Sequence, residues 1–99
     1  MIVVYITAAA GEFDAAVDYL IVSGQRETAG RFQQNVADAE AAILQFPNAH
    51  PPLRGGFRRI LLARFAYQIV YRVEGDTIRI YAVAHLKRRP GYWRQRTAR

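Results

Sequence analysis

The chain has 99 residues, carries a formal net charge of +6 and contains no cysteine. One domain with one hydrophobic core is the default at this length, and the missing cysteines exclude a disulfide framework, a thiolate zinc site and a cysteine nucleophile. Hydrophobic residues make up 52% of the chain and charged residues 22%, which excludes a disordered or fibrous protein. We therefore expect residues 1–99 to form a single domain.

The stretch from Met1 to Gly11 carries no charge, but it is too short to cross a bilayer as a helix. It also lacks the basic start of a signal peptide. Together with the absence of cysteine, these features predict a cytoplasmic protein without a membrane segment. We expect neither a metal ion nor a cofactor.

Charge is distributed unevenly along the chain. Residues 1–49 hold two basic and six acidic side chains, a net charge of −4, whereas residues 50–99 hold twelve basic and two acidic ones, a net charge of +10. Such asymmetry indicates an acidic or polyanionic partner for the second half, either nucleic acid, a ribosome or an acidic polypeptide. The charge pattern alone does not choose between them.

Met1 to Ile6 is apolar and rich in β-branched residues, which predicts an opening strand. Thr7 then stands where it can cap a helix. Gly24 is the expected end of that helix. Apolar residues recur within it at the spacing of one helical stripe, at Phe13, Ala16, Val17, Leu20 and Ile21.

A second helix is predicted from about Arg26, and Pro47 ends it because proline removes a helical hydrogen bond. The short link between the helices predicts an antiparallel helical hairpin. Residues 47–56 hold three prolines and two glycines, which is typical of a loop. The apolar stripe of the second helix steps by three or four positions, at Ala29, Phe32, Val36, Ala39, Ile43 and Phe46.

Three strands are predicted after this loop, over residues 57–62, 67–73 and 77–85. A two-residue turn at Gly75-Asp76 sets the pairing of the last two, because a slip by one residue would place arginines opposite core side chains. The apolar face then pairs Val73 with Ile78, Tyr71 with Ile80 and Ile69 with Ala82. The other face carries Gln68, Val70, Arg72, Arg79, Tyr81, Val83 and His85.

The predicted order of elements is β-α-α-β-β-β, an α+β fold with an antiparallel sheet and the helical hairpin packed on one face. A basic tail, residues 86–99, follows the last strand. It holds six basic residues and no acidic one, and the aromatic pair Tyr92-Trp93 lies among them. We expect the tail to lie across the sheet and to contact something acidic.

Several stretches of the sequence resemble a known family. The middle strand of the predicted meander reads Phe65-Ala66-Tyr67-Gln68-Ile69-Val70-Tyr71-Arg72. The chain then continues through Ala82-Val83-Ala84-His85 to Arg88-Arg89-Pro90-Gly91-Tyr92-Trp93. With this order of elements and with Phe46-Pro47 ending the second helix, nearly the whole chain resembles the RelE/ParE superfamily of bacterial type II toxins.

This resemblance implies a small growth-inhibiting toxin of a plasmid-stabilising kind, encoded beside an antitoxin that binds it in a hetero-oligomer and keeps it inactive. RelE-like members cut messenger RNA in the ribosome, whereas ParE-like members inhibit DNA gyrase and lack the cutting residues. Where RelE-like members carry two arginines, this chain has Gln68 and Leu86. The resemblance therefore favours a ParE-like toxin that acts by binding a large target such as DNA gyrase.

The alternative is a ribosome-dependent messenger RNA endonuclease that uses His85, Arg88 and Tyr92. RNA cleavage needs a base, an acid and a cation near the phosphate, and these side chains are of the right types. Tyr92 matches the tail tyrosine of the RelE-like set. In a structural interpretation, His85 only anchors the tail. A third hypothesis is a basic RNA-binding module without toxicity.

The exposed sheet face and the tail supply the candidate contacts to a target or antitoxin. Arg72 and Arg79 are predicted cross-strand neighbours, a like-charge pair that costs stability unless an acid or anion lies between them. Tyr92 and Trp93 either stack on a partner or anchor the tail on its own domain. A hydrophobic groove beside the acidic hairpin is a second place for an antitoxin helix. The candidate contact residues are Arg72, Arg79, Tyr81, Arg88, Arg89, Tyr92, Trp93 and Arg94.

Overall fold

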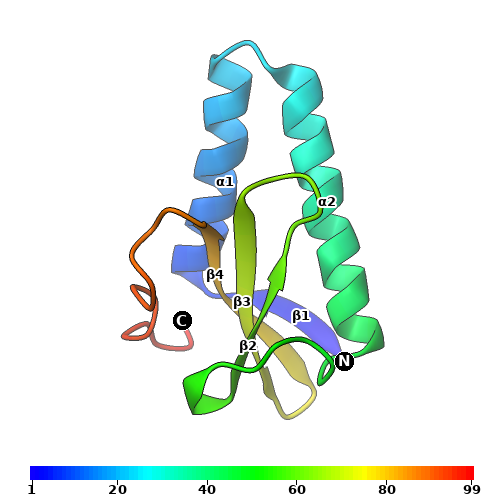
Figure 1. Ribbon diagram of the computed structural model, residues 1–99, viewed down its shortest axis with the longest axis vertical. Helices are drawn as coiled ribbons and strands as arrows, with labels where there is room; N and C mark the ends of the chain where they lie inside the picture. Colours follow the sequence, from blue (N-terminus) through cyan, green and yellow to red (C-terminus); the bar gives the residue numbers. More distant parts are fainter.

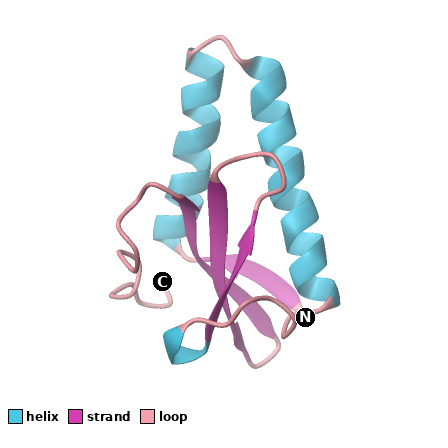
Figure 2. Cartoon of the chain, viewed as in Figure 1, coloured by secondary structure: helices cyan, strands magenta, loops and turns pink.

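The computed structural model describes residues 1–99 and has the predicted order β-α-α-β-β-β (Figure 1). Helices and strands are separated by colour in Figure 2. A single turn of 3-10 helix, η1, precedes the second strand. The elements are β1 (Ile2–Tyr5), α1 (Thr7–Val22), α2 (Arg26–Gln45), η1 (Arg54–Gly56), β2 (Phe57–Leu61), β3 (Tyr67–Glu74) and β4 (Thr77–His85).

The four strands form one sheet in the order β1-β4-β3-β2. β2, β3 and β4 are antiparallel to their neighbours, as predicted. β1 instead lies parallel to β4, so the sheet is mixed and not wholly antiparallel. A parallel pair needs a long crossover, and here the whole of α1, α2, β2 and β3 lies between the two strands.

A β-bulge corrects the predicted pairing of β3 with β4. Val73 pairs with Ile78 and Tyr71 with Ile80, as the turn at Gly75-Asp76 predicts. The register then shifts, so that Ile69 lies opposite Val83 and not opposite Ala82. One extra residue of β4 at the bulge turns the side chains that follow to the other face.

Both helices cover one face of the sheet (Figure 1), and their apolar stripes pack there, except that Ile21, the last predicted stripe residue of α1, is exposed. Every predicted stripe residue of α2 up to Ile43 is buried, and Phe46 is exposed. Phe32 lies near the centre, with the rings of Phe65 and Tyr67 at 5.2 and 5.1 Å. Continuous apolar burial of this kind supplies most of the stability of a small domain.

The far end of the helical hairpin projects beyond the sheet (Figure 1). No residue between positions 18 and 28 is buried, and Tyr19 and Val22 are among the exposed apolar side chains. Gly24 lies just after the end of α1, as predicted, and has the positive φ of 77° that is typical of a residue following a helix. No helix in the structure is both long enough and apolar enough to span a bilayer.

The start of α1 differs from the prediction that Thr7 caps it. Ile6 occupies the cap position and Thr7 is the first helical residue. The Thr7 backbone N–H and hydroxyl both donate to the carbonyl oxygen of Arg99, at 2.9 and 2.6 Å. The tail therefore satisfies a donor that a capping side chain would otherwise bond.

Candidate functional site

Glu74 joins the two arginines of the β3–β4 pair. Arg72 and Arg79 lie directly opposite each other, as predicted. Arg72 Nε donates to Glu74 Oε2 and Arg79 Nε donates to Glu74 Oε1, each at 2.8 Å. The Tyr81 hydroxyl donates to the same carboxylate at 2.6 Å. The acid that the like-charge pair requires is therefore supplied by this chain itself.

These contacts also set the charge state of the cluster. Burial opposes ionisation of Glu74, but hydrogen bonds from Tyr81 and the two arginines outweigh it and lower the pKa to about 2. Burial and the hydrogen bond to Glu74 raise the pKa of Tyr81. At neutral pH the cluster therefore holds an ionised carboxylate between two guanidinium groups, with a neutral phenol beside it.

Trp93 anchors the tail on the face of the sheet that carries this cluster. Its ring centroid lies 4.8 Å from that of Phe57, and Phe57 lies 5.0 Å from Tyr81. Trp93 is only 3% exposed and Tyr81 only 1%. These two residues thus support the surface from beneath, which agrees with the interpretation of the aromatic pair as an anchor of the tail.

Glu12 of α1 holds the second half of the tail. It accepts a hydrogen bond from the Tyr92 hydroxyl, two from the Arg96 guanidinium at 2.9 Å and one from the Val83 backbone N–H at 3.0 Å. Arg96 also donates to the backbone oxygen of Tyr81 at 2.9 Å. A single carboxylate therefore links α1, β4 and the tail.

The Glu12 contacts hold Tyr92 as a neutral phenol. Burial opposes ionisation of Glu12, but hydrogen bonds from Arg96, Tyr92 and the Val83 N–H lower its pKa. Burial and the bond to Glu12 raise the pKa of Tyr92 to about 12. Guanidinium groups also lie over the Tyr92 ring, with Arg88 at 3.9 Å and Arg96 at 4.9 Å from its centroid.

His85 lies on the helix side of the sheet, which corrects its predicted place on the cationic face. The cause is the β-bulge, because it turns Val83 and His85 toward α1. The His85 ring lies 5.1 Å from Tyr67, and its Nδ1 accepts the Lys87 backbone N–H at 3.0 Å. The other histidine, His50, is half-buried, with its ring 6.3 Å from that of Tyr71.

A cavity of about 250 Å³ lies between α1 and the ends of β3 and β4. Its lining includes His85, Arg88, Tyr67 and Glu12. Tyr92 contacts this set through its hydroxyl, which donates to Glu12. The structure thus brings the three residues of the endonuclease hypothesis to one end of the sheet.

The other candidate contact residues differ in exposure. Arg88, Arg89 and Arg94 are exposed on the tail. Arg72 and Arg79 are only partly exposed, because Glu74 holds their guanidinium groups. The free cationic surface is therefore the tail more than the sheet face.

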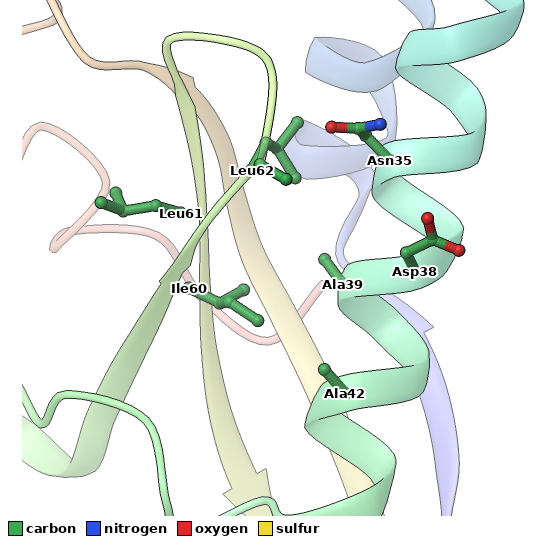
Figure 3. A pocket seen from close by; sticks show the side chains of 8 residues that line it. Asn35, Asp38, Ala39, Ala42, Ile60, Leu61 and Leu62 are labelled. Atoms are coloured by element: carbon green, nitrogen blue, oxygen red, sulfur yellow. The ribbon is translucent and has the colours of Figure 1, made fainter.

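A groove between α2 and β2 matches the hydrophobic groove predicted beside the hairpin (Figure 3). It has a volume of about 170 Å³ and six of its eight lining residues are apolar. In Figure 3, Ile60 points toward α2, where Ala39 and Ala42 leave space for it, and Leu61 points away. Asn35 and Asp38 form the polar part of the lining.

Sequence reasoning missed both glutamates that organise the site. Glu12 carries no local signal, because its partners Tyr92 and Arg96 are 80 and 84 residues away. Glu74 carried a usable signal, because it stands two positions after Arg72 and side chains at i and i+2 of a strand share a face.

These features define a small α+β protein that combines an acidic helical hairpin with an arginine-rich sheet and tail. The chain matches the family described as the ParE toxin of the type II toxin-antitoxin system, parDE, over residues 3–90, and it belongs to this family. The predicted membership of the ParE-like branch is thereby confirmed.

A solved structure described as the chromosomal ParDE TA system from P. aeruginosa is similar to this chain. The two share 25% sequence identity and a TM-score of 0.72, and the match covers 86% of this chain and 95% of that chain. No curated protein matches the chain.

Proposed function

We propose that this toxin acts by binding a large target such as DNA gyrase, not by cleaving RNA, and that a cognate antitoxin neutralises it in the cytoplasm. Membership of the ParE family supports an antitoxin partner and a place in a type II system. The gyrase target follows from the ParE-like character of the sequence at Gln68 and Leu86.

The state of Tyr92 is the observation that carries the non-catalytic part of the proposal. A general acid or base works best when its pKa lies near the operating pH. The pKa of Tyr92 is raised to about 12, and its hydroxyl is held by Glu12. Gln68 also supplies no cation, and its amide oxygen accepts a hydrogen bond from Arg59 at 3.3 Å. These contacts suit a tail anchor better than a proton-transfer group.

Two assays on the purified toxin test the proposal. We expect inhibition of supercoiling by DNA gyrase and no cleavage of messenger RNA on translating ribosomes. We expect His85→Ala to inhibit gyrase as well as the unchanged toxin does, because the His85 ring packs against Tyr67 on the helix side of the sheet. Cleavage by the unchanged toxin that disappears in both His85→Ala and Tyr92→Phe would refute the proposal.

Ribosome-dependent cleavage is the second candidate, and the cavity beside α1 is the observation in its favour. His85 and Arg88 line it together, which places an imidazole near a cation. That pair could take a proton and stabilise a phosphate only with substrate in the cavity. A toxin that cuts ribosomal messenger RNA, and leaves gyrase active, would establish this second function.

The groove between α2 and β2 is the surface we assign to the antitoxin. Its apolar floor suits the apolar face of a partner helix or an extended segment with small anchors. The neighbouring residue Arg64 is exposed and adds a cation at the end of the groove. An antitoxin segment with apolar anchors and acidic flanks fits this combination.

A further inference from the structure

The tail carries a group of cations that the chain itself leaves uncompensated. Four basic side chains of the tail form this group, and all of them are exposed. The arginines that form ion pairs in the protein are Arg72, Arg79 and Arg96, which are not among the four. Glu12 and Glu74 are therefore already occupied by other arginines. These four cations are Lys87, Arg88, Arg89 and Arg94; the fifth exposed cation of the tail, Arg99, lies apart from them at residue 99.

Two of these cations are held in place by aromatic rings. The Arg88 guanidinium lies 3.9 Å from the Tyr92 ring centroid, and the Arg94 guanidinium lies 4.5 Å from that of Trp93. Arg94 also donates to the backbone oxygen of Arg54 at 3.2 Å. The rings themselves are fixed, because Glu12 holds Tyr92 and the core holds Trp93. Pre-oriented guanidinium forks lose less rotamer entropy when they bind phosphate.

The composition of this surface favours nucleic acid over a protein partner. The centre of a protein interface is depleted in charge and rich in apolar side chains. Nucleic-acid interfaces are more polar and much more positively charged. Leu86, at the start of the tail, is its one exposed large apolar side chain, and Pro90 and Gly91 separate the cations.

The low accessibility of the two aromatic rings of the tail indicates that the nucleic acid bound there is a duplex and not a single strand. Proteins that hold single strands stack bases on exposed aromatic side chains. Trp93 is 3% exposed, and arginines lie over the Tyr92 ring. Neither ring is free for a base, whereas the cations remain free for backbone phosphates.

We propose that the tail binds the phosphate backbone of a nucleic-acid duplex without reading its sequence. This binding is a property of the toxin itself and does not depend on gyrase being the target. Contacts to phosphates position a protein on a duplex and carry no base specificity.

Fluorescence anisotropy with the full chain and a short labelled duplex of arbitrary sequence tests the proposal. We expect affinity to fall linearly with salt on a log–log scale, since bound phosphates release counterions. The double variant Arg88→Ala/Arg94→Ala should reduce that slope by about 1.8, which is two contacts at about 0.9 each. Arg26→Ala/Arg31→Ala is the matched control, because it removes the same charge from the hairpin end, and its slope should stay unchanged.

Two further measurements compare DNA with RNA as the bound duplex and control for misfolding of the alanine variant. DNA and RNA duplexes of equal length show which one the tail prefers, and preference for either supports the proposal. Arg88→Lys/Arg94→Lys keeps the charge and should keep the slope while weakening binding, because lysine lacks the planar fork. Absence of duplex binding at low salt, tighter binding of a single strand, or equal losses in the tail variant and the hairpin control would overturn the proposal.

Discussion

Glu74 and Glu12 determine how a chain with so many arginines folds without self-repulsion. Two guanidinium groups that face each other across a strand pair repel and lower stability. Glu74 bonds to both members of such a pair, and Glu12 receives the tail through Arg96. Each carboxylate is half-buried, so these contacts are screened less by salt than ion pairs at the open surface.

Replacing Glu74 should cost stability at neutral pH. Glu74→Gln keeps the shape of the side chain but removes its charge, leaving Arg72 and Arg79 opposite each other without an anion. We expect the free energy of unfolding to fall by about 1.5–3 kcal/mol, the range for hydrogen bonds to charged groups. Urea denaturation measures it, with Asp76→Asn as the control, because Asp76 is exposed and lies in the turn two residues further on.

The stabilisation by Glu74 should also depend on pH, and the pKa of its carboxyl group gives the direction. The pKa of Glu74 is about 2 in the folded protein and 4.5 when unperturbed. A lowered pKa means that the stabilisation is complete above pH 4.5 and is lost as the pH falls toward 2. The difference between the unchanged protein and Glu74→Gln should therefore shrink over this interval. A difference that stays constant from neutral pH down to pH 2 would contradict the assigned role.

At the scale of elements, local patterns predict both helices and all four strands, but not every contact between them. The stripe of α2 and the turn at Gly75-Asp76 are local signals, and the structure confirms both. The bulge near Val70 left no signal, because alternating and shifted registers both bury apolar side chains there. The parallel pairing of β1 also depends on a partner more than seventy residues away. Local periodicity does not specify contacts over such separations.

The groove between α2 and β2 makes a prediction about the antitoxin. Ala42 lines the groove and Ala41, its neighbour on α2, is exposed. Ala42→Trp should fill the groove and weaken antitoxin binding by about tenfold, or roughly 1.4 kcal/mol. Ala41→Trp should leave the affinity unchanged. Isothermal titration calorimetry compares the two, and equal affinities would move the interface to the tail or the sheet face.

At the scale of the whole molecule, the acidic hairpin and the basic sheet and tail give the protein a strongly asymmetric field. The formal net charge of +6 is the sum of −4 over residues 1–49 and +10 over residues 50–99. Such a field guides an acidic partner before contact, and salt weakens it. The tertiary contacts that shape this surface, above all those of Glu12, lay outside the reach of sequence patterns because they join residues 71 to 84 positions apart.

Antitoxin association should therefore depend on salt mainly through its rate. We expect the association rate to fall by about tenfold or more between low and high salt, while dissociation changes less. Arg64→Glu, beside the groove, should lower the rate at low salt, and Arg26→Glu, at the start of α2, should lower it less. Stopped-flow fluorescence gives both rates, and equal effects of the two variants would refute guidance toward the groove.

The parallel pairing of β1 with β4 has a consequence for synthesis on the ribosome. Of the four strands, β1 is made before the others, yet its neighbour in the sheet, β4, is the last of the four to be made. When both helices have emerged from the ribosome, β4, the strand that pairs with β1, has not yet been made. The sheet therefore cannot be completed before β4 has been made, so a message terminated before residue 77 yields a product in which β1 has no partner strand.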